Sequence, residues 1–465
     1  METRSLKFVA GACDAEMASG SPEAKVENVC TDSRLAKAGD VFLAIKGEKF
    51  DGHDFIAEVA GKGVTAVVVE KSRAPGLKGK VPTGTGMLVV DDVRIALGKL
   101  GAVYRRDFQI PVIAVGGSNG KTTTKELLAS VLRQKFPALW SEASFNNDIG
   151  VPMTLLRLDK THRAAVLEAG TNHPGELAPL VKMIAPKYGV ITNIGREHLE
   201  FFGDVAGVAQ EEGMLAELLP ADGKLFLNGD SEWADKIAAR TKAQVIRIGT
   251  GEGNDWRARK IRLDKNGATF QVECAKKDFA GEYRVNLLGK HQVTNALFAI
   301  AVSEELGVGR AEIQRGLTEC KPAKMRMQFW EANGIRVLDD AYNANADSMR
   351  AALETLCGLP LQGRRVAVLG DMAELGAHGE AAHAEIGRLA AELKIGQLFT
   401  VGKNSAATAK AAREAGLTRV IEFADVEAAI KAVKNFLKPG DVVLLKASRS
   451  SRLERIAETL KTDKN

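Results

Sequence analysis

The sequence has few of the features that mark secreted, membrane-spanning or nucleic-acid-binding proteins. Its five cysteines are scattered and never spaced C-x-x-C, which argues against a disulfide framework or zinc cluster and favours a reducing cytoplasm. No run approaches the ~20 apolar residues of a membrane-spanning helix, and the apolar stretch Phe8–Cys13 is too short for a signal peptide. The net charge is only +5. We therefore expect a cytoplasmic protein that neither inserts into a membrane nor binds nucleic acid. We also expect a monomer, although the composition does not bear on the oligomeric state.

What the sequence does contain is typical of a large α/β protein. Hydrophobic residues make up 45% and charged residues 26% of the 465 positions, and 46 glycines against 13 prolines suit many tight turns between strands and helices. Apolar runs of strand length alternate with amphipathic helical stretches such as Lys121–Gln134 and His378–Leu393. This alternation predicts parallel sheets covered by helices. The predicted strands are Val41–Ile45, Ala66–Glu70, Ile110–Val115, Ala164–Glu168, Tyr188–Ile194, Lys224–Leu227, Arg365–Leu369, Gln397–Val401 and Asp441–Leu445.

Two breaks divide the chain into three expected domains, a number that the length also suggests at ~150 residues per domain. Pro82, Gly84 and Gly86 cluster at one break, within Lys80–Gly86, and Pro322 lies at the other, within Lys321–Lys324. We therefore expect domains at residues 1–85, 86–321 and 322–465.

A glycine-rich segment, Val112–Thr124, runs from an apolar strand into a helix and predicts a phosphate-binding loop. Backbone N–H groups of such a loop, with the positive end of the helix dipole, bind phosphate oxygens. Lys121 would reach the β- and γ-phosphates of a nucleotide, and Thr122 would hold Mg²⁺. The strict pattern G-x-x-x-x-G-K-[ST] fails because Val115 stands at its first glycine, so a glycine-rich turn without a ligand is the alternative. The loop residues expected to bind nucleotide are Gly117, Ser118, Asn119, Gly120, Lys121, Thr122 and Thr123.

Acidic and histidine side chains follow two strands near this loop. Glu168 ends one predicted strand, and Glu197 and His198 come shortly after another. Ligands of parallel sheets gather at the carboxyl ends of the strands, and carboxylate, hydroxyl and phosphate oxygens suit Mg²⁺. Glu168 and His198 are therefore candidate metal ligands; a solvated strand end and a structural histidine are the alternatives.

A series of further motifs resembles those of the Mur ligase family, in the family's order, over residues 31–449. Within that family the resemblance is to the ligases that add a D-alanyl-D-alanine dipeptide. The motifs are Thr31–Arg34, Gly39–His53, Ser144–Leu156, Glu168–Glu176, Thr192–Leu199, His291–Asn295, Asp339–Asn345, Leu369–Gly376 and Lys446–Arg449.

The resemblance implies a small α/β domain for the UDP-sugar substrate, a central phosphate-loop ATPase domain and a Rossmann-like C-terminal domain that contributes to nucleotide and D-Ala-D-Ala binding. It implies an ADP-forming amide ligase, with ATP and Mg²⁺ as cofactors and UDP-MurNAc-tripeptide and D-Ala-D-Ala as substrates. The reaction would pass through an acyl phosphate in peptidoglycan precursor synthesis. Whether the third residue of the tripeptide is diaminopimelate or lysine stays open.

The resemblance also implies roles for individual residues. Lys121, Glu168, His198 and Arg326 would be catalytic, with Arg326 reaching the phosphates from the C-terminal domain. The remaining implied contacts are Asn295 to adenine, Asp340 to the ribose, Tyr342 near the nucleotide, Asn146, Asn147 and Thr154 at the junction of nucleotide and substrate, and Ser33, Arg34, Lys46 and Gly47 in the UDP pocket. The alternatives are a helix cap for Asn295, a solvated turn for Asp340 and a surface role for Arg326.

One position departs from the family's pattern. The family places a lysine, carbamylated in use, 14 residues after the metal-motif histidine, whereas this chain has Glu212 there and no lysine between His198 and Lys224. A glutamate supplies the same charge and oxygen ligands, although its carboxyl group is ~3–4 Å nearer the backbone, so a bridging water or a closer helix is required. We expect Glu212 to be a metal ligand that works without bicarbonate. The alternatives are a surface role for Glu212 and a ligand supplied by Glu211.

Four other functions compete with this interpretation. A ligase that adds the third peptide residue carries an Asp-Asn-Pro-Arg motif after a C-terminal strand. The comparable strand here ends in Thr400–Asn404, and the motif is missing. A folate-polyglutamate ligase leaves the UDP-type N-terminal motifs unexplained. A regulatory homologue that binds ATP without ligation is favoured only by the missing lysine, and a phosphate-loop hydrolase lacks a switch-like pattern.

Overall fold

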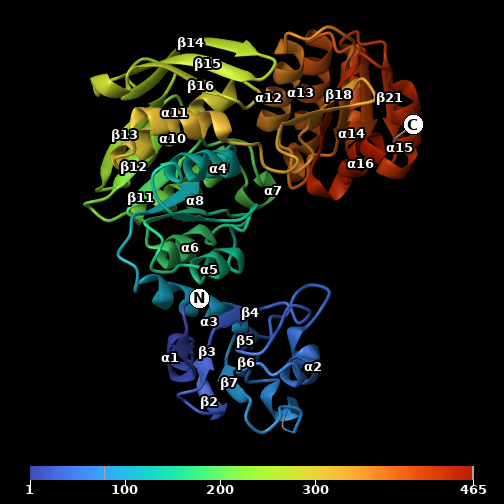
Figure 1. Ribbon diagram of the computed structural model, residues 1–465. Helices are drawn as coiled ribbons and strands as arrows, with labels where there is room; N and C mark the ends of the chain where they lie inside the picture. The colour runs from blue at the N-terminus through green and yellow to red at the C-terminus, as the bar shows by residue number, and fades with distance from the viewer. Residues whose placement is uncertain (78, 463–465) are drawn as a thin grey trace. The chain divides into compact units, whose positions relative to one another are not determined.

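The computed structural model describes residues 1–77 and 79–462, which form two compact units. The first unit contains Met1–Ala114, Phe136–Gly170 and Ala178–Lys187. The second contains Val115–Lys135, Thr171–Leu177 and the chain from Tyr188 onward. Strand β8 (Val112–Gly116) has residues in both units. Figure 1 labels many of the helices and strands of each unit. Among the described residues, no helix is both long and apolar enough to span a bilayer.

The first unit is built around a five-stranded sheet in the order β2-β7-β6-β5-β4. Strands β4 to β7 pair in parallel, and β2 is antiparallel to β7. The strands of this unit are β1 (Arg4–Ser5), β2 (Glu16–Ser19), β3 (Lys25–Val26), β4 (Asn28–Cys30), β5 (Asp40–Leu43), β6 (Ala66–Glu70), β7 (Gly86–Val90), β9 (Ala138–Trp140) and β10 (Ala164–Glu168). Its helices are α1 (Leu6–Ala12), α2 (Ile56–Gly61), α3 (Val93–Arg105), α5 (Gly150–Leu155) and nearly all of α6 (Leu177–Ile184).

Burial explains why these segments take their places. Strand β6 reads Ala-Val-Val-Val-Glu with its four apolar residues buried, the composition of a strand covered on both faces. Helix α3 starts where the Asp92 side chain accepts a hydrogen bond from the Ile95 N–H, and it buries one stripe that includes Leu97, Leu100 and Tyr104. In β10, which pairs in parallel with β9, all five residues are buried, the terminal Glu168 included.

The second unit holds most of the strands of one large sheet and all of a separate six-stranded sheet. Its strands are β11 (Tyr188–Ile191), β12 (Lys224–Asn228), β13 (Gln244–Gly249), β14 (Trp256–Asp264), β15 (Gly267–Cys274), β16 (Gly281–Val285), β17 (Gln328–Ala332), β18 (Ile335–Asp339), β19 (Arg365–Gly370), β20 (Gln397–Val401), β21 (Val420–Phe423) and β22 (Val442–Lys446). Its helices are α4 (Lys121–Leu132), α7 (Leu199–Phe202), α8 (Val205–Glu217), α9 (Ala234–Ala238), α10 (His291–Glu305), α11 (Arg310–Glu319), α12 (Ala346–Gly358), α13 (Gly379–Glu392), α14 (Ser405–Glu414), α15 (Val426–Phe436) and α16 (Glu454–Thr462).

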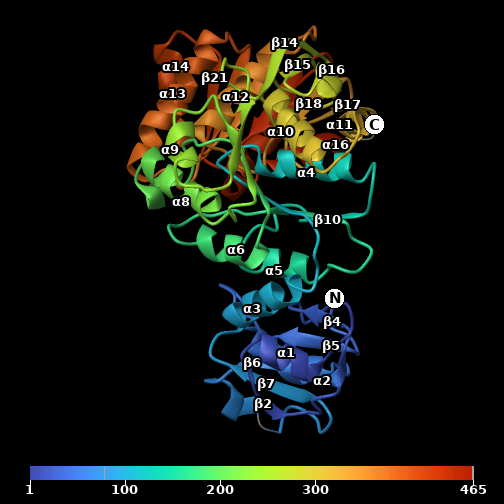
Figure 2. The same ribbon diagram turned by 90° about the vertical axis from the view of Figure 1, so that its left-hand side faces the viewer.

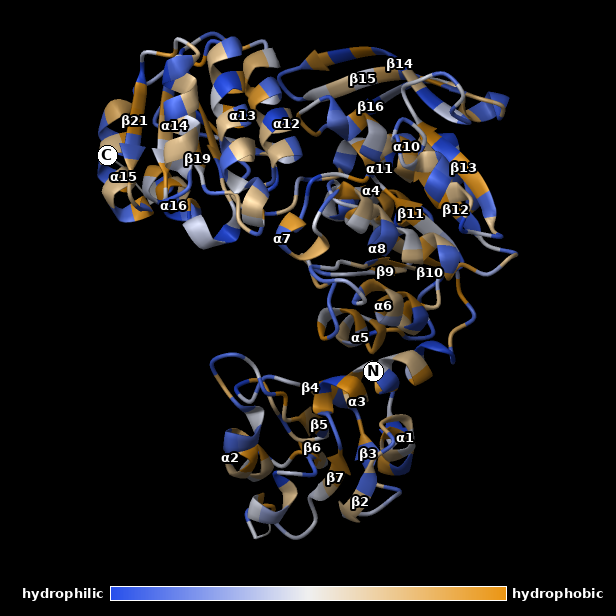
Figure 3. Cartoon of the chain, turned by 180° about the vertical axis from the view of Figure 1, so that it is seen from behind, coloured by the Kyte–Doolittle hydropathy of each residue, from blue (hydrophilic) through white to orange (hydrophobic). Residues whose placement is uncertain are grey.

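Strands β11 to β14 pair in parallel, and β15 and β16 continue the sheet in antiparallel fashion. Helix α4 packs against α10 and α11 beside these strands (Figure 2). The six-stranded sheet has the order β17-β18-β22-β19-β20-β21, parallel except for β17. Helices α13 and α14 pack together, and Figure 3 shows hydrophobic and hydrophilic residues on both, as expected for helices that cover a sheet.

The α/β class is confirmed, and each of the nine predicted strand regions contains a strand. The ends differ by a few residues. The predicted strand Tyr188–Ile194 stops at Ile191 because the following residues turn toward the phosphate loop, where the Thr192 hydroxyl bonds the Asn119 carbonyl. The predicted helices Lys121–Gln134 and His378–Leu393 are observed as Lys121–Leu132 and Gly379–Glu392.

Candidate active site

The turn between β8 and α4 has the shape of a phosphate-binding loop. Gly117 and Gly120 have φ values of +105° and +87°, which favour glycine. A Cβ atom on Gly117 would lie 2.5 Å from Thr192 Oγ1, and one on Gly120 would lie 2.6 Å from Asn295 Oδ1. Asn119 N–H donates to Asn193 Oδ1 at 2.6 Å. The backbone therefore bends closely at the N-terminus of a twelve-residue helix, where phosphate oxygens are bound in other proteins.

Lys121, the first residue of α4, folds back over this loop. Its ammonium group donates to the Gly117 carbonyl and, at 3.3 Å, to the Ser118 carbonyl. It also lies 3.3 Å from Glu197 Oε2. Lys121 thus places a positive charge at the mouth of the loop, as the sequence predicts for a lysine that contacts phosphates.

Two buried carboxylates lie beside Lys121. Glu212, on α8, is fully buried, and its Oε2 accepts the Gly117 N–H at 2.6 Å. Glu197 is 6% exposed. Glu197 Oε1 and Glu212 Oε1 have no hydrogen-bond partner among the described residues. Unpartnered buried carboxylate oxygens are costly, so their presence here indicates that a cation or a water completes the site.

The charge balance of this cluster is visible in Glu212. Burial raises the pKa of its carboxyl to about 7, and repulsion from Glu197 adds to the rise, while Lys121 and the Gly117 N–H oppose it. Helix α8 brings the short glutamate side chain directly to the loop. Glu212 is therefore not a surface residue.

His198 faces the same cluster from the start of α7. Its backbone has a φ of +49°, a conformation uncommon for residues other than glycine. Its Nδ1 hydrogen-bonds to Glu374 Oε2, and its Nε2 lies 3.9 Å from Glu197 Oε2. The hydrogen bond from His198 holds the pKa of the Glu374 carboxyl below its usual value. Sequence reasoning assigned no role to Glu374, 176 residues farther along the chain.

The donor set fits Mg²⁺ better than a transition metal. Carboxylate and hydroxyl oxygens are its preferred protein ligands, and it commonly retains waters and phosphate oxygens. Within the described ranges, no group of three or more His, Cys, Asp or Glu side chains is arranged to hold a metal ion. The residues therefore suit a metal that is bound together with nucleotide phosphates rather than one held by a complete protein cage.

Glu168 shows the same chemistry in the first unit. It ends β10 with 1% exposure, its Oε1 accepts the Asn146 side-chain amide at 2.9 Å, and its backbone N–H donates to Ser141 Oγ. In the described part of the chain, Glu168 Oε2 has no hydrogen-bond partner. A solvated strand end is thus not what the structure shows.

Two other candidates of the first unit have local roles. Asn147 Oδ1 accepts the N–H of Gly150 at 2.8 Å, at the start of α5. The Thr154 hydroxyl, 1% exposed, donates to the Gly150 carbonyl within the same helix. Both contacts order the segment that follows Asn146. Of the three candidates Asn146, Asn147 and Thr154, Asn146 is the one that hydrogen-bonds to Glu168.

Asn295 lies inside α10 rather than at its end, because the helix begins at His291. Its Nδ2 donates to Gln292 Oε1 at 2.9 Å, and its Oδ1 accepts from Thr124 Oγ1 at 3.3 Å. The helix-cap interpretation is therefore wrong. The side chain ties α10 to the base of the phosphate loop, next to Gly120.

Three candidates from the C-terminal part of the second unit form a connected group. The Arg326 guanidinium lies over the Tyr342 ring, 4.1 Å from its centroid. Asp340 follows β18; its Oδ2 accepts from Lys446 at 2.6 Å and its Oδ1 from the Met327 N–H at 3.1 Å. Asp340 is 9% exposed, so it is not a solvated turn residue.

The N-terminal candidates lie on two loops of the five-stranded sheet. Arg34 is exposed, and its guanidinium pairs with Asp32. The Ser33 carbonyl accepts from Lys62 at 2.7 Å. The backbones of Lys46 and Asp51 form an isolated antiparallel β-bridge. The Gly47 N–H donates to the Phe50 carbonyl at 2.9 Å. These loops present polar groups at the ends of β4 and β5.

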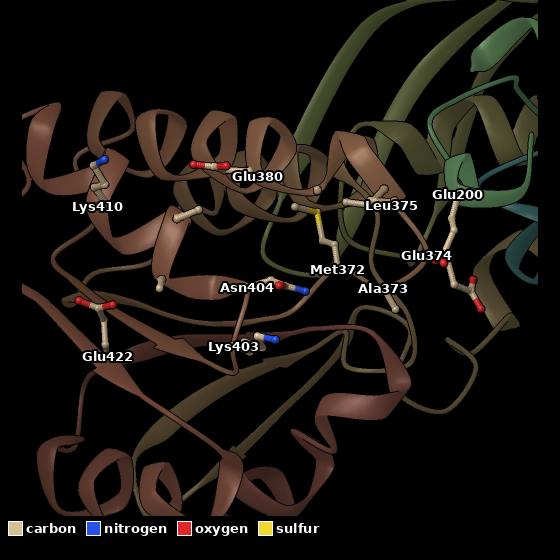
Figure 4. Close-up of a pocket in the computed structure, with 14 residues that line it drawn as sticks. Glu200, Met372, Ala373, Glu374, Leu375, Glu380, Lys403, Asn404, Lys410 and Glu422 are labelled. Atoms are coloured by element: carbon tan, nitrogen blue, oxygen red, sulfur yellow. The ribbon is translucent and has the colours of Figure 1, made fainter. Parts of the chain in front are cut away.

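A cavity of about 730 Å³ opens at the carboxyl ends of β19 and β20 (Figure 4). Glu200 and Glu374 lie at one end of it, Lys410 and Glu422 at the other, and Lys403 between them. The full lining is Glu200, Met372, Ala373, Glu374, Leu375, Gly376, Gly379, Glu380, Lys403, Asn404, Ala406, Ala407, Lys410 and Glu422. Charges of both signs thus face one space at the edge where parallel sheets bind ligands.

Arg196 forms an ion-pair network that the sequence motifs did not predict. It donates to Asp347 Oδ1 through two nitrogens, at 2.9 and 2.7 Å, and to Glu385 Oε2 at 2.6 Å. Arg350 also donates to Glu385, at 2.8 Å. Hydrogen bonds from Arg196 lower the pKa of the Glu385 carboxyl to about 2. The network joins the loop after β11 to helices α12 and α13.

Three family models match the chain. The Mur ligase family catalytic domain matches residues 25–105, the Mur ligase middle domain residues 115–303, and the Mur ligase glutamate ligase domain residues 325–449.

Relatives and solved structures cover nearly the whole chain. The Escherichia coli (strain K12) UDP-N-acetylmuramoyl-tripeptide–D-alanyl-D-alanine ligase is 36% identical over 94% of each chain. A crystal structure of MurF from Acinetobacter baumannii has a TM-score of 0.90 and 34% identity over 99% of each chain. MurF ligase from Thermotoga maritima, solved in complex with ADP, has a TM-score of 0.80 and 27% identity over 93% of this chain and 96% of that one.

Proposed function

The chain belongs to the Mur ligase family, and we propose that it catalyses the reaction for which its relatives are named. It is an ATP-dependent ligase that joins D-alanyl-D-alanine to UDP-N-acetylmuramoyl-tripeptide and forms ADP and phosphate. The observation that carries this proposal is the phosphate loop with Lys121 beside two buried carboxylates that each have an oxygen without a partner among the described residues.

The chemistry explains why such a cluster is needed. A carboxylate is a poor acylating agent, so the terminal carboxylate of the tripeptide is first phosphorylated and the resulting acyl phosphate is attacked by the dipeptide amine. Phosphate and carboxylate repel each other as they approach. Lys121 and Arg326 reduce this repulsion and stabilise the charge on the transferring phosphoryl group.

We assign the Mg²⁺ ligands to Thr122, Glu168, His198 and Glu212. Bound there, Mg²⁺ would neutralise phosphate charge and orient the oxygens for transfer. Glu212 carries its own carboxylate, so the proposal includes activity without bicarbonate. Activity of Glu212→Ala at the wild-type level, in buffers with and without CO₂, would contradict this assignment.

The remaining contacts follow the same division of labour. Gly117, Ser118, Asn119, Gly120 and Thr123 bind the nucleotide phosphates, with Asn295, Asp340 and Tyr342 around the nucleoside. On the substrate side, Asn146, Asn147 and Thr154 order the loop that leads to Glu168, and the UDP group binds at Ser33, Arg34, Lys46 and Gly47.

We assign D-Ala-D-Ala to the cavity at β19 and β20. The dipeptide is a zwitterion, and the cavity offers carboxylates at one end and the ammonium group of Lys403 farther in. We expect Lys403→Ala to raise the KM for the dipeptide about tenfold, because a charge-assisted hydrogen bond to its carboxylate is lost. Steady-state kinetics with varied dipeptide check this, with Lys410→Ala as the control on the same wall. An unchanged KM would place the dipeptide elsewhere.

The proposal also includes the domain boundaries, the oligomeric state and the cellular location. The domains are residues 1–85, 86–321 and 322–465, and the protein works as a monomer in the cytoplasm. The chemistry supports this location, since both proposed substrates are small, charged molecules.

One assay tests the proposed function. ADP release should require both UDP-MurNAc-tripeptide and D-Ala-D-Ala. Phosphate release without either substrate would indicate a hydrolase, and nucleotide binding without turnover a regulatory homologue. A panel of UDP-MurNAc-tripeptides that differ only at the third residue would identify the preferred substrate. Joining of a single amino acid to a UDP-MurNAc-dipeptide would instead indicate the ligase that adds the third residue.

A further inference from the structure

We propose that Glu374 is a positioning residue that holds the His198 imidazole with Nε2 facing the phosphate-loop cluster. The inference rests on the proposed function, in which His198 is a metal ligand. It adds a residue of the loop after β19 to the machinery around the phosphate loop, and that residue also lines the cavity at β19 and β20.

Both residues of the His198–Glu374 contact have an uncommon backbone conformation. His198 has a φ of +49° and Glu374 a φ of +59°, so two residues other than glycine in direct contact both lie in the left-handed region. Such conformations persist where surrounding contacts enforce them, and they are concentrated at functional sites. The strain on both partners indicates that the fold maintains this contact.

Backbone contacts fix Glu374 next to α7. The Glu200 N–H donates to the Glu374 carbonyl at 3.0 Å. Gly376, two residues on, lies so close to α7 that a Cβ atom there would be 3.1 Å from Glu200 Cα. The loop after β19 is therefore seated on the short helix that His198 begins, and Figure 4 shows Glu200 beside Glu374.

The two ring nitrogens of His198 face different groups. Nδ1 contacts the Glu374 carboxylate, which only accepts hydrogen bonds, so the proton of the neutral ring belongs on Nδ1. The Nε2 lone pair is then directed to the side where Glu197 Oε2 lies 3.9 Å away and where Lys121 reaches the same oxygen. A carboxylate that orients a histidine in this way commonly strengthens metal binding by the opposite nitrogen.

The cavity gives the contact a second consequence. Glu374 belongs to the cavity wall, so a positively charged group that enters the cavity lies near the carboxylate that orients His198. The proposed dipeptide amine is such a group. Glu374 thus links the place where the amine arrives to the residue that faces the phosphate loop.

The test separates positioning from a purely structural tie. The ring tautomer of His198 is read from ¹H–¹⁵N correlation spectra of the full-length protein at pH 8 without metal, and His198→Gln identifies its signals. We expect the Nδ1–H form in the wild type and in the control Glu392→Ala, which removes an exposed glutamate of α13 outside the cavity lining. Glu374→Ala should shift the ring toward the Nε2–H form, and Glu374→Gln, which keeps an acceptor oxygen, should restore much of the wild-type signal.

A second readout uses the reaction. The Mg²⁺ concentration for half-maximal ADP release should rise about tenfold in Glu374→Ala, while Glu392→Ala stays at the wild-type value. If either the tautomer or the Mg²⁺ dependence is unchanged in Glu374→Ala, the proposal is wrong. Should Glu374→Ala fail to fold, the isosteric Glu374→Gln carries the test through a smaller rise in the Mg²⁺ requirement, and an unchanged requirement overturns the proposal. A wild-type protein without ligase activity would contradict the proposed function instead, and leaves the tautomer measurement intact.

Discussion

Arg196 and Glu197 are neighbours in one loop, yet they belong to regions with opposite electrostatics. Arg196 donates to Asp347 and Glu385, so the charges of that network are paired. Glu197 faces Lys121 on the other side, and one of its oxygens has no partner among the described residues. Fully paired charges thus indicate a structural contact in this loop, whereas buried charges with unsatisfied oxygens indicate a place where a ligand binds.

The same contrast recurs one helix farther on. Glu211 accepts the N–H groups of Gly175 and Leu177, at 2.9 and 2.8 Å, so both of its oxygens are used. Glu212 is its neighbour, and only one of its oxygens has a partner among the described residues. In both comparisons a fully paired group lies next to an incompletely paired carboxylate. Glu385, in the Arg196 network, is therefore the control for Glu197, and Glu211 is the control for Glu212.

The largest expected effect comes from removing the positively charged side chain of Lys121 from the phosphate loop. Lys121→Ala should abolish ligation, with a loss of at least ~10³-fold in kcat, because no other side chain of the loop carries positive charge. Binding of the UDP substrate, measured by calorimetry, should stay largely intact. ADP formation by this variant at the wild-type rate would contradict the phosphate-loop assignment.

A matched pair of glutamate variants sharpens the comparison at the next level. Glu197→Gln should lower kcat by about 10²-fold with little effect on the free energy of unfolding, since its charge serves the reaction. Glu385→Gln should do the reverse, lowering the free energy of unfolding by about 1–2 kcal/mol because Arg196 and Arg350 lose their shared carboxylate. Turnover assays and urea denaturation measure both. If the two variants behaved alike, the distinction between the regions would fail.

The smallest effect is a pH dependence of stability. The pKa of the Glu212 carboxyl is raised to about 7 in the folded protein, above its unfolded value of about 4.5. The unfolded state therefore releases this proton first, and the free energy of unfolding of the ligand-free protein falls as pH rises from about 4.5 to 7. Glu212→Gln removes this cost, so the variant should be more stable than the wild type by about 1–3 kcal/mol at pH 8 and no more stable at pH 4.5.

Glu211→Gln is the control for this measurement. Its carboxylate is fully hydrogen-bonded, so the substitution should lower the free energy of unfolding at both pH values. Chemical denaturation of the wild type and both variants at pH 4.5 and pH 8 gives the comparison. A loss of stability in Glu212→Gln at pH 8 would show that the buried carboxylate is satisfied in the ligand-free protein.

Local sequence signals predicted the α/β fold and the strand–loop–helix shape of the phosphate loop. The buried run that ends in Gly-Gly-Ser-Asn-Gly-Lys-Thr predicts a strand, a loop and a helix because each step has its own local signature, and all three are observed. Glu168 and His198 became candidate ligands because polar residues follow apolar strands. Such patterns depend on neighbours in the chain, which a single sequence displays.

Residues whose roles depend on distant partners were harder to predict. Glu374 contacts a histidine 176 residues away, and Arg196 contacts Glu385 across 189 residues, so neither pairing leaves a local pattern. Asn295 resembled a cap because the apolar helix was expected to begin there, whereas the helix starts one turn earlier. Glu197 stands next to His198 in the motif, and only the turn of the loop shows that its carboxylate faces Lys121.

The most direct test of the central claim is a crystal structure of the full-length protein with a non-hydrolysable ATP analogue and Mn²⁺, in which anomalous scattering locates the metal. We predict that the terminal phosphoryl group contacts Lys121 and that the metal lies within coordination distance of a carboxylate oxygen of Glu212 or of the Nε2 atom of His198. A terminal phosphoryl group distant from Lys121, with no metal beside Glu168, His198 or Glu212, would contradict the account.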